Sequence, residues 1–104
     1  MKTKKVGNLI IIVGKTLGHL GQSSFMREIY SVNEVSPPEI NLTNEKNNGQ
    51  SILNLINLNL VASCHDVSSG GILISLAEMS MASMVGLKIL KPKKFTDLNE
   101  YFFA

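Results

Sequence analysis

The stretch VASCHDVSSGGILISLAEMS, residues 61–80, joins a short apolar segment to a longer apolar pattern through a turn of serines and glycines. The segment LVASC, residues 60–64, has the length and composition of a buried strand. After the paired glycines, apolar side chains recur at the spacing of a helix, at Ile72, Leu73, Leu76 and Met79. The stretch therefore predicts a strand that leads through a tight turn into a helix.

Two other segments have the composition of strands. Residues 8–13 contain three consecutive isoleucines and a valine, so β-branched side chains would occupy both faces of a pleated strand. We therefore expect this segment to be a central strand that is covered on both sides. The segment VGLKIL, residues 85–90, is the candidate for a third strand.

Two more helices are predicted between the first two strands. In QSSFMREIYS, residues 22–31, polar residues that can cap a helix precede apolar ones. In NLTNEKNNGQSILNLINLNL, residues 41–60, Asn41 or Thr43 can cap the N-terminus. Asn59 is expected to end this helix, because asparagine tolerates the left-handed conformation better than most residues.

The tail TDLNEYFFA, residues 96–104, has a candidate cap in Thr96 or Asp97 and predicts a final helical turn. The order of elements is therefore strand, helix, helix, strand, helix, strand and a helical turn. This order predicts the α/β (α+β) class, in which a mixed β-sheet has helices packed on it, and a single domain over residues 1–104.

The composition is that of a soluble globular protein, with 44% hydrophobic and 17% charged residues. One cysteine cannot form an internal disulfide and fits a reducing compartment, so we expect a cytoplasmic protein. The apolar run at residues 9–13 is too short for a signal sequence or a membrane helix. The basic clusters KTKK and KPKK have few aromatic neighbours and predict solvated termini, so neither a membrane nor a nucleic acid is an expected partner.

Three familiar chemical sites do not fit the sequence. The sequence VGKT, residues 13–16, resembles the end of a phosphate-binding P-loop, but Leu9 stands where that loop needs a glycine. Cys64 and His65 are neighbours in a predicted strand, so their side chains would point to opposite faces and could not act as nucleophile and base. A zinc site lacks ligands, because His19 is the only other histidine. A buried thiol and a hydrogen-bonded histidine are the expected alternative.

The turn HDVSSGG, residues 65–71, is the candidate site, and it has two interpretations. Free N–H groups at a helix N-terminus favour anions, and glycines let a phosphate or another backbone approach closely, so the turn could bind phosphate. Alternatively, an aspartate or serine of the turn caps the helix, and the glycines serve tight packing. The candidate residues are His65, Asp66, Ser68, Ser69, Gly70 and Gly71.

Three blocks, LGQSSFMREIY, SPPEINLTNEKNNGQSILNLINLNLV and HDVSSGGILISLAEMSMAS, occur in an order and spacing that resemble one enzyme family. It is the synthetase subunit of phosphoribosylformylglycinamidine synthase, the PurL type, of purine biosynthesis. The likeness is to its last domain, which is shared with aminoimidazole ribonucleotide synthetase. The resemblance covers residues 8–90. It implies that the chain folds as an incomplete aminoimidazole ribonucleotide synthetase C-terminal-like domain.

The sequence also departs from the family pattern. Ser69 stands where the family has an acid, Asn41 where it has aspartate, Asn59 where it usually has glycine, and Ser36 where glycine or another small residue precedes the prolines. The family's acid at this position would carry a negative charge that could stabilise the helix N-terminus, and Ser69 lacks that charge. The family's domain also continues beyond the region of EYFFA, so the resemblance implies that residues 1–104 form a truncated domain.

The resemblance implies an ATP-dependent carbon–nitrogen ligase in which ammonia from a glutaminase subunit converts a formamide into an amidine. The full-length family uses ATP and Mg²⁺, and its catalytic and metal-binding residues belong to domains without a counterpart here. We therefore expect no catalytic residue, metal site or bound cofactor in this chain alone, and no activity. The alternative is a non-catalytic binding or assembly module that self-associates or pairs with the remainder of the synthase.

Overall fold

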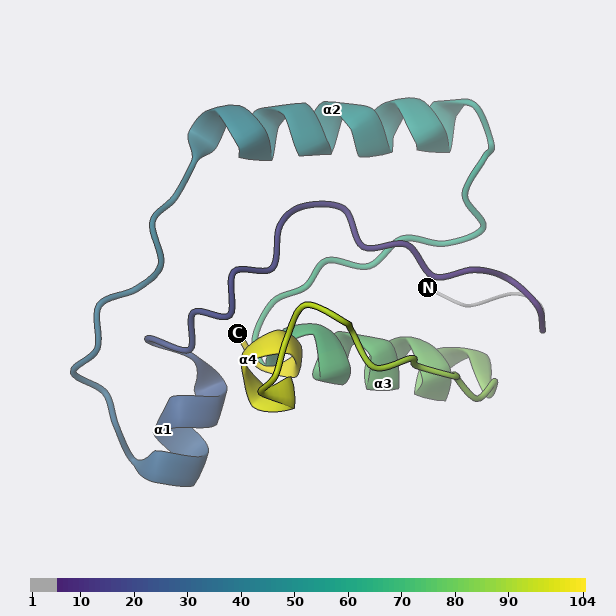
Figure 1. Ribbon diagram of the computed structural model, residues 1–104. Helices are drawn as coiled ribbons and strands as arrows, with labels where there is room; N and C mark the ends of the chain where they lie inside the picture. The colour runs from purple at the N-terminus through teal and green to yellow at the C-terminus, as the bar shows by residue number, and fades with distance from the viewer. Residues whose placement is uncertain (1–5) are drawn as a thin grey trace.

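The computed structural model describes residues 6–104 of the chain and contains four helices joined by long irregular segments (Figure 1). The helices are α1 (Ser24–Tyr30), α2 (Leu42–Asn57), α3 (Gly71–Ser83) and α4 (Leu98–Phe102). No residue between positions 6 and 104 belongs to a β-strand. None of the helices in this part of the chain combines the length and apolarity needed to cross a membrane.

The predicted mixed β-sheet is therefore wrong for the described chain. A helix completes its backbone hydrogen bonds within its own segment, whereas a strand completes them only with a neighbouring strand in register. Strand propensity reflects that context more than an intrinsic preference of the backbone. The segments predicted as strands, residues 8–13, 60–64 and 85–90, have the expected side chains but no strand partner in this structure.

Residues 60–66 still show the alternation of side chains that suggested a strand. Val61, Ser63 and His65 are half-buried, while the residues between them are exposed. This period of two is the one that an extended backbone imposes on its side chains. The segment therefore has a buried side and an exposed side without being part of a sheet.

The apolar segment at residues 8–13 differs most from its prediction. On one side of the segment Leu9 is 89% exposed and Ile11 is 79% exposed, while Ile10 and Ile12 on the other side are 42% and 41% exposed, so one face is open and the other is only partly covered. The prediction of a central, doubly covered strand is wrong because the segment has no strand partner in the described chain and none of its apolar side chains is buried. A run of large apolar side chains in contact with water is unfavourable by itself.

The predicted helices are present, and the N-terminal caps of α1, α2 and α4 are side chains that the sequence suggested. The Ser23 hydroxyl oxygen accepts a hydrogen bond from the Met26 N–H at the start of α1. The Asn41 side-chain oxygen accepts from the Asn44 N–H at 2.9 Å, and Asp97 caps α4 in the same way. These contacts satisfy N–H groups that have no partner within the helix.

The C-terminal end of α2 confirms the predicted role of Asn59. This residue has a left-handed backbone with φ of 55°. The Asn59 N–H donates to the Ile56 carbonyl oxygen, and the Leu60 N–H donates to the Leu55 carbonyl oxygen. This pair of bonds is the Schellman arrangement, which satisfies the last carbonyl groups of a helix.

The small core lies along α3, where it meets α4 and the C-terminal residues. Ile72 and Leu76 are the buried hydrophobic residues, at 5% and 8% exposure, and Ser75 lies between them. Phe103 follows α4 and stacks on Phe25 of α1, with ring centroids 4.8 Å apart. The core thus joins α1, α3 and α4 but does not include α2, in which no residue is buried.

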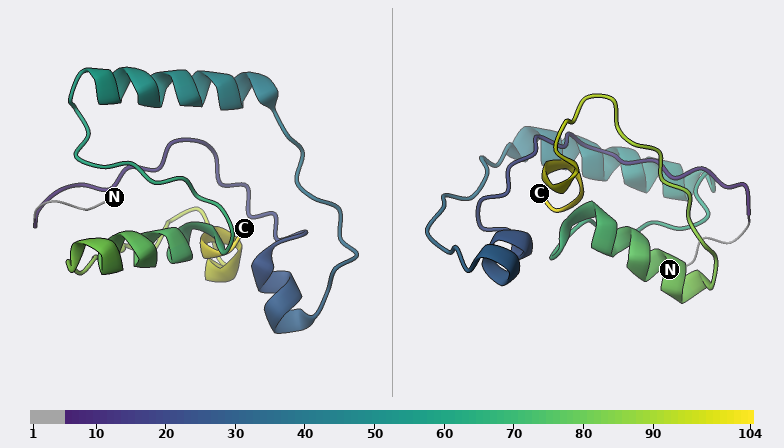
Figure 2. Two further views of the ribbon diagram at one scale, coloured as in Figure 1. Left: turned by 180° about the vertical axis from the view of Figure 1, so that it is seen from behind. Right: turned by 60° about the horizontal axis from the view of Figure 1, so that its bottom comes forward.

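The molecule is extended for its length. Its radius of gyration is 14.9 Å, whereas a compact domain of this size has a value of about 13 Å. Its accessible surface is 8183 Å², compared with roughly 5800 Å² for a folded monomer of 11.4 kDa. In Figures 1 and 2, α2 lies apart from the other helices, with irregular segments between it and α3.

Candidate functional site

The turn at residues 68–71 has a backbone that only glycine adopts easily. Gly70 and Gly71 have φ values of 95° and 75°, both in the left-handed region. The Gly71 N–H donates to the Ser68 carbonyl oxygen at 3.1 Å, which closes the turn immediately before α3. The paired glycines therefore allow the chain to reverse direction and enter the helix within four residues.

The interpretation that Asp66, Ser68 or Ser69 caps α3 is not supported. Gly70 is the N-cap residue, and no side chain accepts a hydrogen bond from the first turn of α3. The N–H groups of that turn have no side-chain partner, so they differ from those of α1, α2 and α4. Unpaired N–H groups at a helix N-terminus attract negative charge.

The chain packs closely at Gly71, which the second part of that interpretation expects of the glycines. A Cβ atom at this position would lie 2.6 Å from the Phe102 carbonyl oxygen and 2.8 Å from the Phe103 Cα. No side chain fits at those distances without moving the backbone of the C-terminal segment. Gly71 therefore allows the end of α4 to pack directly on the start of α3.

A cavity of about 300 Å³ lies between this turn and the start of α1. It brings together two sequence blocks that are about 45 residues apart, LGQSS and SSGG. Its polar lining consists mainly of hydroxyl groups, amide groups and one guanidinium group. The lining residues are Gln22, Ser23, Ser24, Arg27, Ser68, Ser69, Gly70, Gly71, Phe103 and Ala104.

Hydrogen bonds connect the two sides of this cavity. The hydroxyl groups of Ser24 and Ser69 lie 2.9 Å apart. The Arg27 guanidinium donates to the Ser24 hydroxyl oxygen at 3.3 Å and also pairs with Glu28 at 2.9 Å. Ser69 therefore occupies a position next to a cationic group, where an acid would be attracted to Arg27 but would repel an anionic ligand.

His65 and Asp66 belong to the same turn but do not line the cavity. The His65 Nδ1 lies 2.6 Å from the Asp66 carbonyl oxygen, and its Nε2 lies 3.2 Å from the Glu78 carboxylate of α3. Both ring nitrogens thus lie next to oxygen atoms that can accept hydrogen bonds. The prediction of a hydrogen-bonded histidine is confirmed, and this side chain fixes the turn to α3.

Ser75 supports the turn from within the helix. Its hydroxyl lies 3.2 Å from the Gly71 carbonyl oxygen and 3.3 Å from that of Asp66, so it can donate to either. Cys64, by contrast, is exposed, so the predicted burial of its thiol is wrong. The cause is the missing sheet, since the side of residues 60–66 that carries Cys64 has no layer packed on it.

The donor set of the cavity fits a phosphate group and does not fit a magnesium ion. Hydroxyl, guanidinium and backbone N–H groups are donors for phosphate oxygens. Magnesium is held by carboxylates, and no Asp or Glu lines the cavity. Within residues 6–104, no group of three or more His, Cys, Asp or Glu side chains is placed to hold a metal ion.

The sequence alone predicted Ser68, Ser69, Gly70 and Gly71 as site residues. It did not predict the residues at the start of α1 that form the other wall of the cavity. Ser24 and Arg27 were assigned only to the predicted helix at residues 22–31. The available signal was the LGQSS block, which the resemblance pairs with HDVSSGG. Nothing in residue spacing alone shows that the start of α1 meets the start of α3.

Comparison with known proteins agrees with this arrangement of blocks. Residues 5–102 match the family described as AIR synthase related protein, C-terminal domain. The chain is 45% identical over its full length to the phosphoribosylformylglycinamidine synthase subunit PurL of Pelagibacter ubique, of which it covers 14%. It is 40% identical over 97% of its length to the subunit of the same name from Bradyrhizobium diazoefficiens, again covering 14%.

No solved structure matches the chain. The chain spans about one seventh of the length of the curated relatives that it matches. The family model nevertheless covers nearly all of its residues, including both blocks that line the cavity. The chain therefore belongs to the family of AIR synthase related proteins, as a PurL-type C-terminal domain.

Proposed function

We propose that the chain contributes one domain to an ATP-dependent, amidine-forming carbon–nitrogen ligase of purine biosynthesis and has no ligase activity by itself. The single observation that supports this proposal is the full-length identity of 45% to a synthase subunit of which the chain covers 14%. The acidic residues of the chain are scattered one by one. Catalytic acids and the magnesium ligands would then come from other parts of the enzyme.

The test is a steady-state assay of the purified chain with ATP, Mg²⁺, ammonia and formylglycinamide ribonucleotide. We expect no turnover above a protein-free control. The same chain mixed with the remaining domains of a relative's synthase, expressed without their own last domain, is expected to raise the rate. ADP release by the chain alone that depends on the ribonucleotide would contradict the proposal.

We further propose that the cavity between α1 and α3 binds a phosphate group of the enzyme's nucleotide or ribonucleotide. The hydroxyl groups of Ser24 and Ser69 and the Arg27 guanidinium support this role, and so does the N-terminus of α3, which has no side-chain cap. The hydroxyl at position 69 in place of an acid removes a negative charge that would repel phosphate.

Calorimetry with inorganic phosphate and with ATP tests this role. In the Ser69→Asp variant, the new carboxylate should reduce phosphate affinity at least about tenfold, since a like charge at contact distance opposes the ligand. Ser51→Asp on the exposed face of α2 adds the same charge outside the cavity and is the matched control. Equal losses in both variants, or no binding to the unchanged chain at millimolar phosphate, would contradict this role.

The large exposed surface supports an assembly role as a second candidate function. The accessible surface exceeds that of a typical monomer by roughly 2400 Å², which is more than the area one partner buries in a standard interface. We propose that self-association or the remainder of the synthase covers this surface. Native mass spectrometry should show oligomers or a complex, and a stable, folded monomer with no tendency to associate would contradict the proposal.

A further inference from the structure

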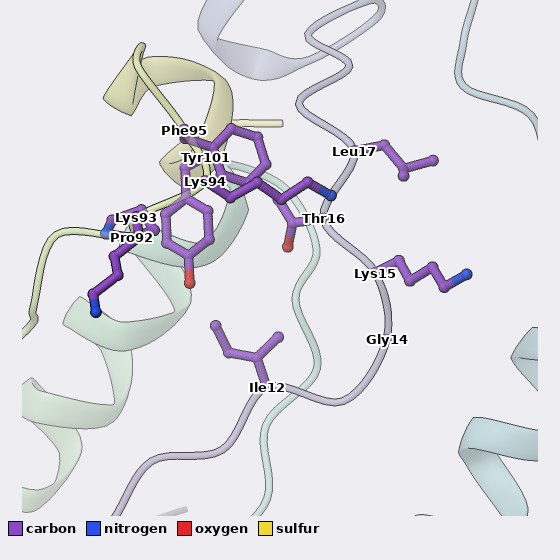
Figure 3. Close-up of a pocket in the computed structure, with 10 residues that line it drawn as sticks. All are labelled: Ile12, Gly14, Lys15, Thr16, Leu17, Pro92, Lys93, Lys94, Phe95 and Tyr101. Atoms are coloured by element: carbon purple, nitrogen blue, oxygen red, sulfur yellow. The ribbon is translucent and has the colours of Figure 1, made fainter.

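A second and larger cavity, of about 680 Å³, lies between the N-terminal segment and the residues around the start of α4 (Figure 3). The loop at residues 12–17 forms one wall, and residues 92–95 with Tyr101 of α4 form the other. Sequence reasoning treated the two basic segments of these walls separately, as a failed P-loop and a solvated cluster. The structure places them at the same opening.

The interior of this cleft is apolar. Ile12, Phe95 and Tyr101 line it, and in Figure 3 the Tyr101 ring and the Ile12 side chain point toward one another. The rings of Phe95 and Tyr101 lie 5.2 Å apart and support each other. Rigid aromatic rings in a pocket are typical anchoring sites for a side chain of a partner protein.

The rim of the cleft is basic. Lys15 and Lys93 extend outward on opposite sides, and Lys94 extends across the opening toward Thr16 (Figure 3). No Asp or Glu lines the cleft, and no described acid forms an ion pair with any of the three lysines. Glu100 of α4 is close in sequence to Tyr101, but its carboxylate lies next to Gly18 and outside the lining.

An apolar centre with a charged rim is the usual anatomy of a protein interface. We propose that this cleft binds an acidic peptide segment, with one large apolar side chain seated between Ile12 and Tyr101 and carboxylates on either side facing the rim lysines. The inference rests on the proposed assembly role and specifies the chemistry of the partner. The three positively charged lysines favour a negatively charged partner and speed its association.

The test measures the fluorescence anisotropy of labelled peptides mixed with the full chain. The probe is Asp-Glu-Phe-Glu-Asp, and two control peptides replace its phenylalanine with glycine or its acids with lysine. We expect binding of the probe that weakens as salt is raised, weaker binding of the glycine peptide, and no binding of the lysine peptide. Failure of the unchanged chain to bind the probe overturns the inference.

Variants locate the binding. Lys94→Glu should weaken the probe's affinity at least about fivefold, because reversal replaces an attraction with a repulsion. Lys46→Glu on α2 makes the same charge change outside the lining of the cleft and should leave affinity within about twofold. Leu17→Ser tests the apolar contribution at an exposed position of the lining, and circular dichroism verifies that each variant keeps its helices.

Each other outcome contradicts the inference in a recognisable way. Equal losses for Lys94→Glu and Lys46→Glu mean a general effect of net charge. Equal affinity for the phenylalanine and glycine peptides would show that no apolar side chain binds between Ile12 and Tyr101. Tighter binding of a single-stranded RNA of equal charge would show that the cleft prefers a nucleic acid to a peptide. Native mass spectrometry tests the assembly role without these peptides, so failure of the inference and failure of the proposed assembly role can be told apart.

Discussion

The sequence predicts a turn and a helix at residues 65–83 and a central, doubly covered strand at residues 8–13, yet only the first region contributes to the core. Around α3, Ile72 and Leu76 are buried, and hydrogen bonds from His65 and Ser75 hold the preceding turn. The run at residues 9–13 has more apolar side chains, all of them exposed. Apolar composition thus produces a core only where the backbone already has partners for its hydrogen bonds.

The largest expected difference between the two regions is in side-chain truncation. Leu76→Ala should lower the free energy of unfolding by about 2 kcal/mol or more, because the side chain is buried and little else can fill the space. Ile11→Ala should change it by less than about 0.5 kcal/mol, since this side chain is already in water. Urea denaturation followed by circular dichroism measures both, and equal effects would mean that the run at residues 9–13 is covered in solution.

Substitution of glycine by alanine gives a second, somewhat smaller contrast. Gly71→Ala should cost about 1–3 kcal/mol, since its φ of 75° disfavours alanine and the new Cβ would meet Phe102 and Phe103. Gly49→Ala in α2 has free space around it and should stabilise that helix by about 0.5–1 kcal/mol. Thermal unfolding followed by circular dichroism compares the two variants. A gain in stability from Gly71→Ala would contradict the contact with the C-terminal segment.

Two serine hydroxyls that bond to carbonyl groups within helices provide the third contrast. The Ser75 hydroxyl is buried and supports the turn, so Ser75→Ala should cost about 1 kcal/mol. The Ser51 hydroxyl bonds to the Asn47 carbonyl on the exposed surface of α2, where water can replace it. Ser51→Ala should be neutral within about 0.5 kcal/mol. Denaturation midpoints that shift equally for both variants would show that α3 is as open to water as α2.

The helices and their ends were predictable because the signals are local. Ser23, Asn41 and Asp97 cap the helices through atoms no more than three residues away, and Asn59 ends α2 by its own backbone conformation. The sheet was not predictable in this way, because each strand needs a partner that the segment itself does not contain. The segments at residues 8–13, 60–64 and 85–90 carry the side chains of strands without the pairing.

The candidate site was predictable on one side only. The serines and glycines at positions 68–71 stood out because they separate two apolar segments. Their partners Ser24 and Arg27 looked like ordinary helix residues, since their role depends on how α1 meets α3. The absence of a side-chain cap on α3 was also unexpected, because three residues of the right type precede it.

The smallest expected effect concerns the end of α2. Asn59 holds φ at 55°, a conformation that glycine adopts without the steric cost of a Cβ atom. Asn59→Gly should therefore stabilise α2 by a few tenths of a kcal/mol up to about 1 kcal/mol, while Asn59→Ala should destabilise it by a similar amount. Hydrogen exchange of the Asn59 and Leu60 amides, which close the helix end, measures both changes. If α2 packed on a partner in solution, that contact would hold the helix end and both variants would exchange at the rate of the unchanged chain. A difference between them would show instead that the end of α2 depends on its own local bonds, as the exposed surface of this helix indicates.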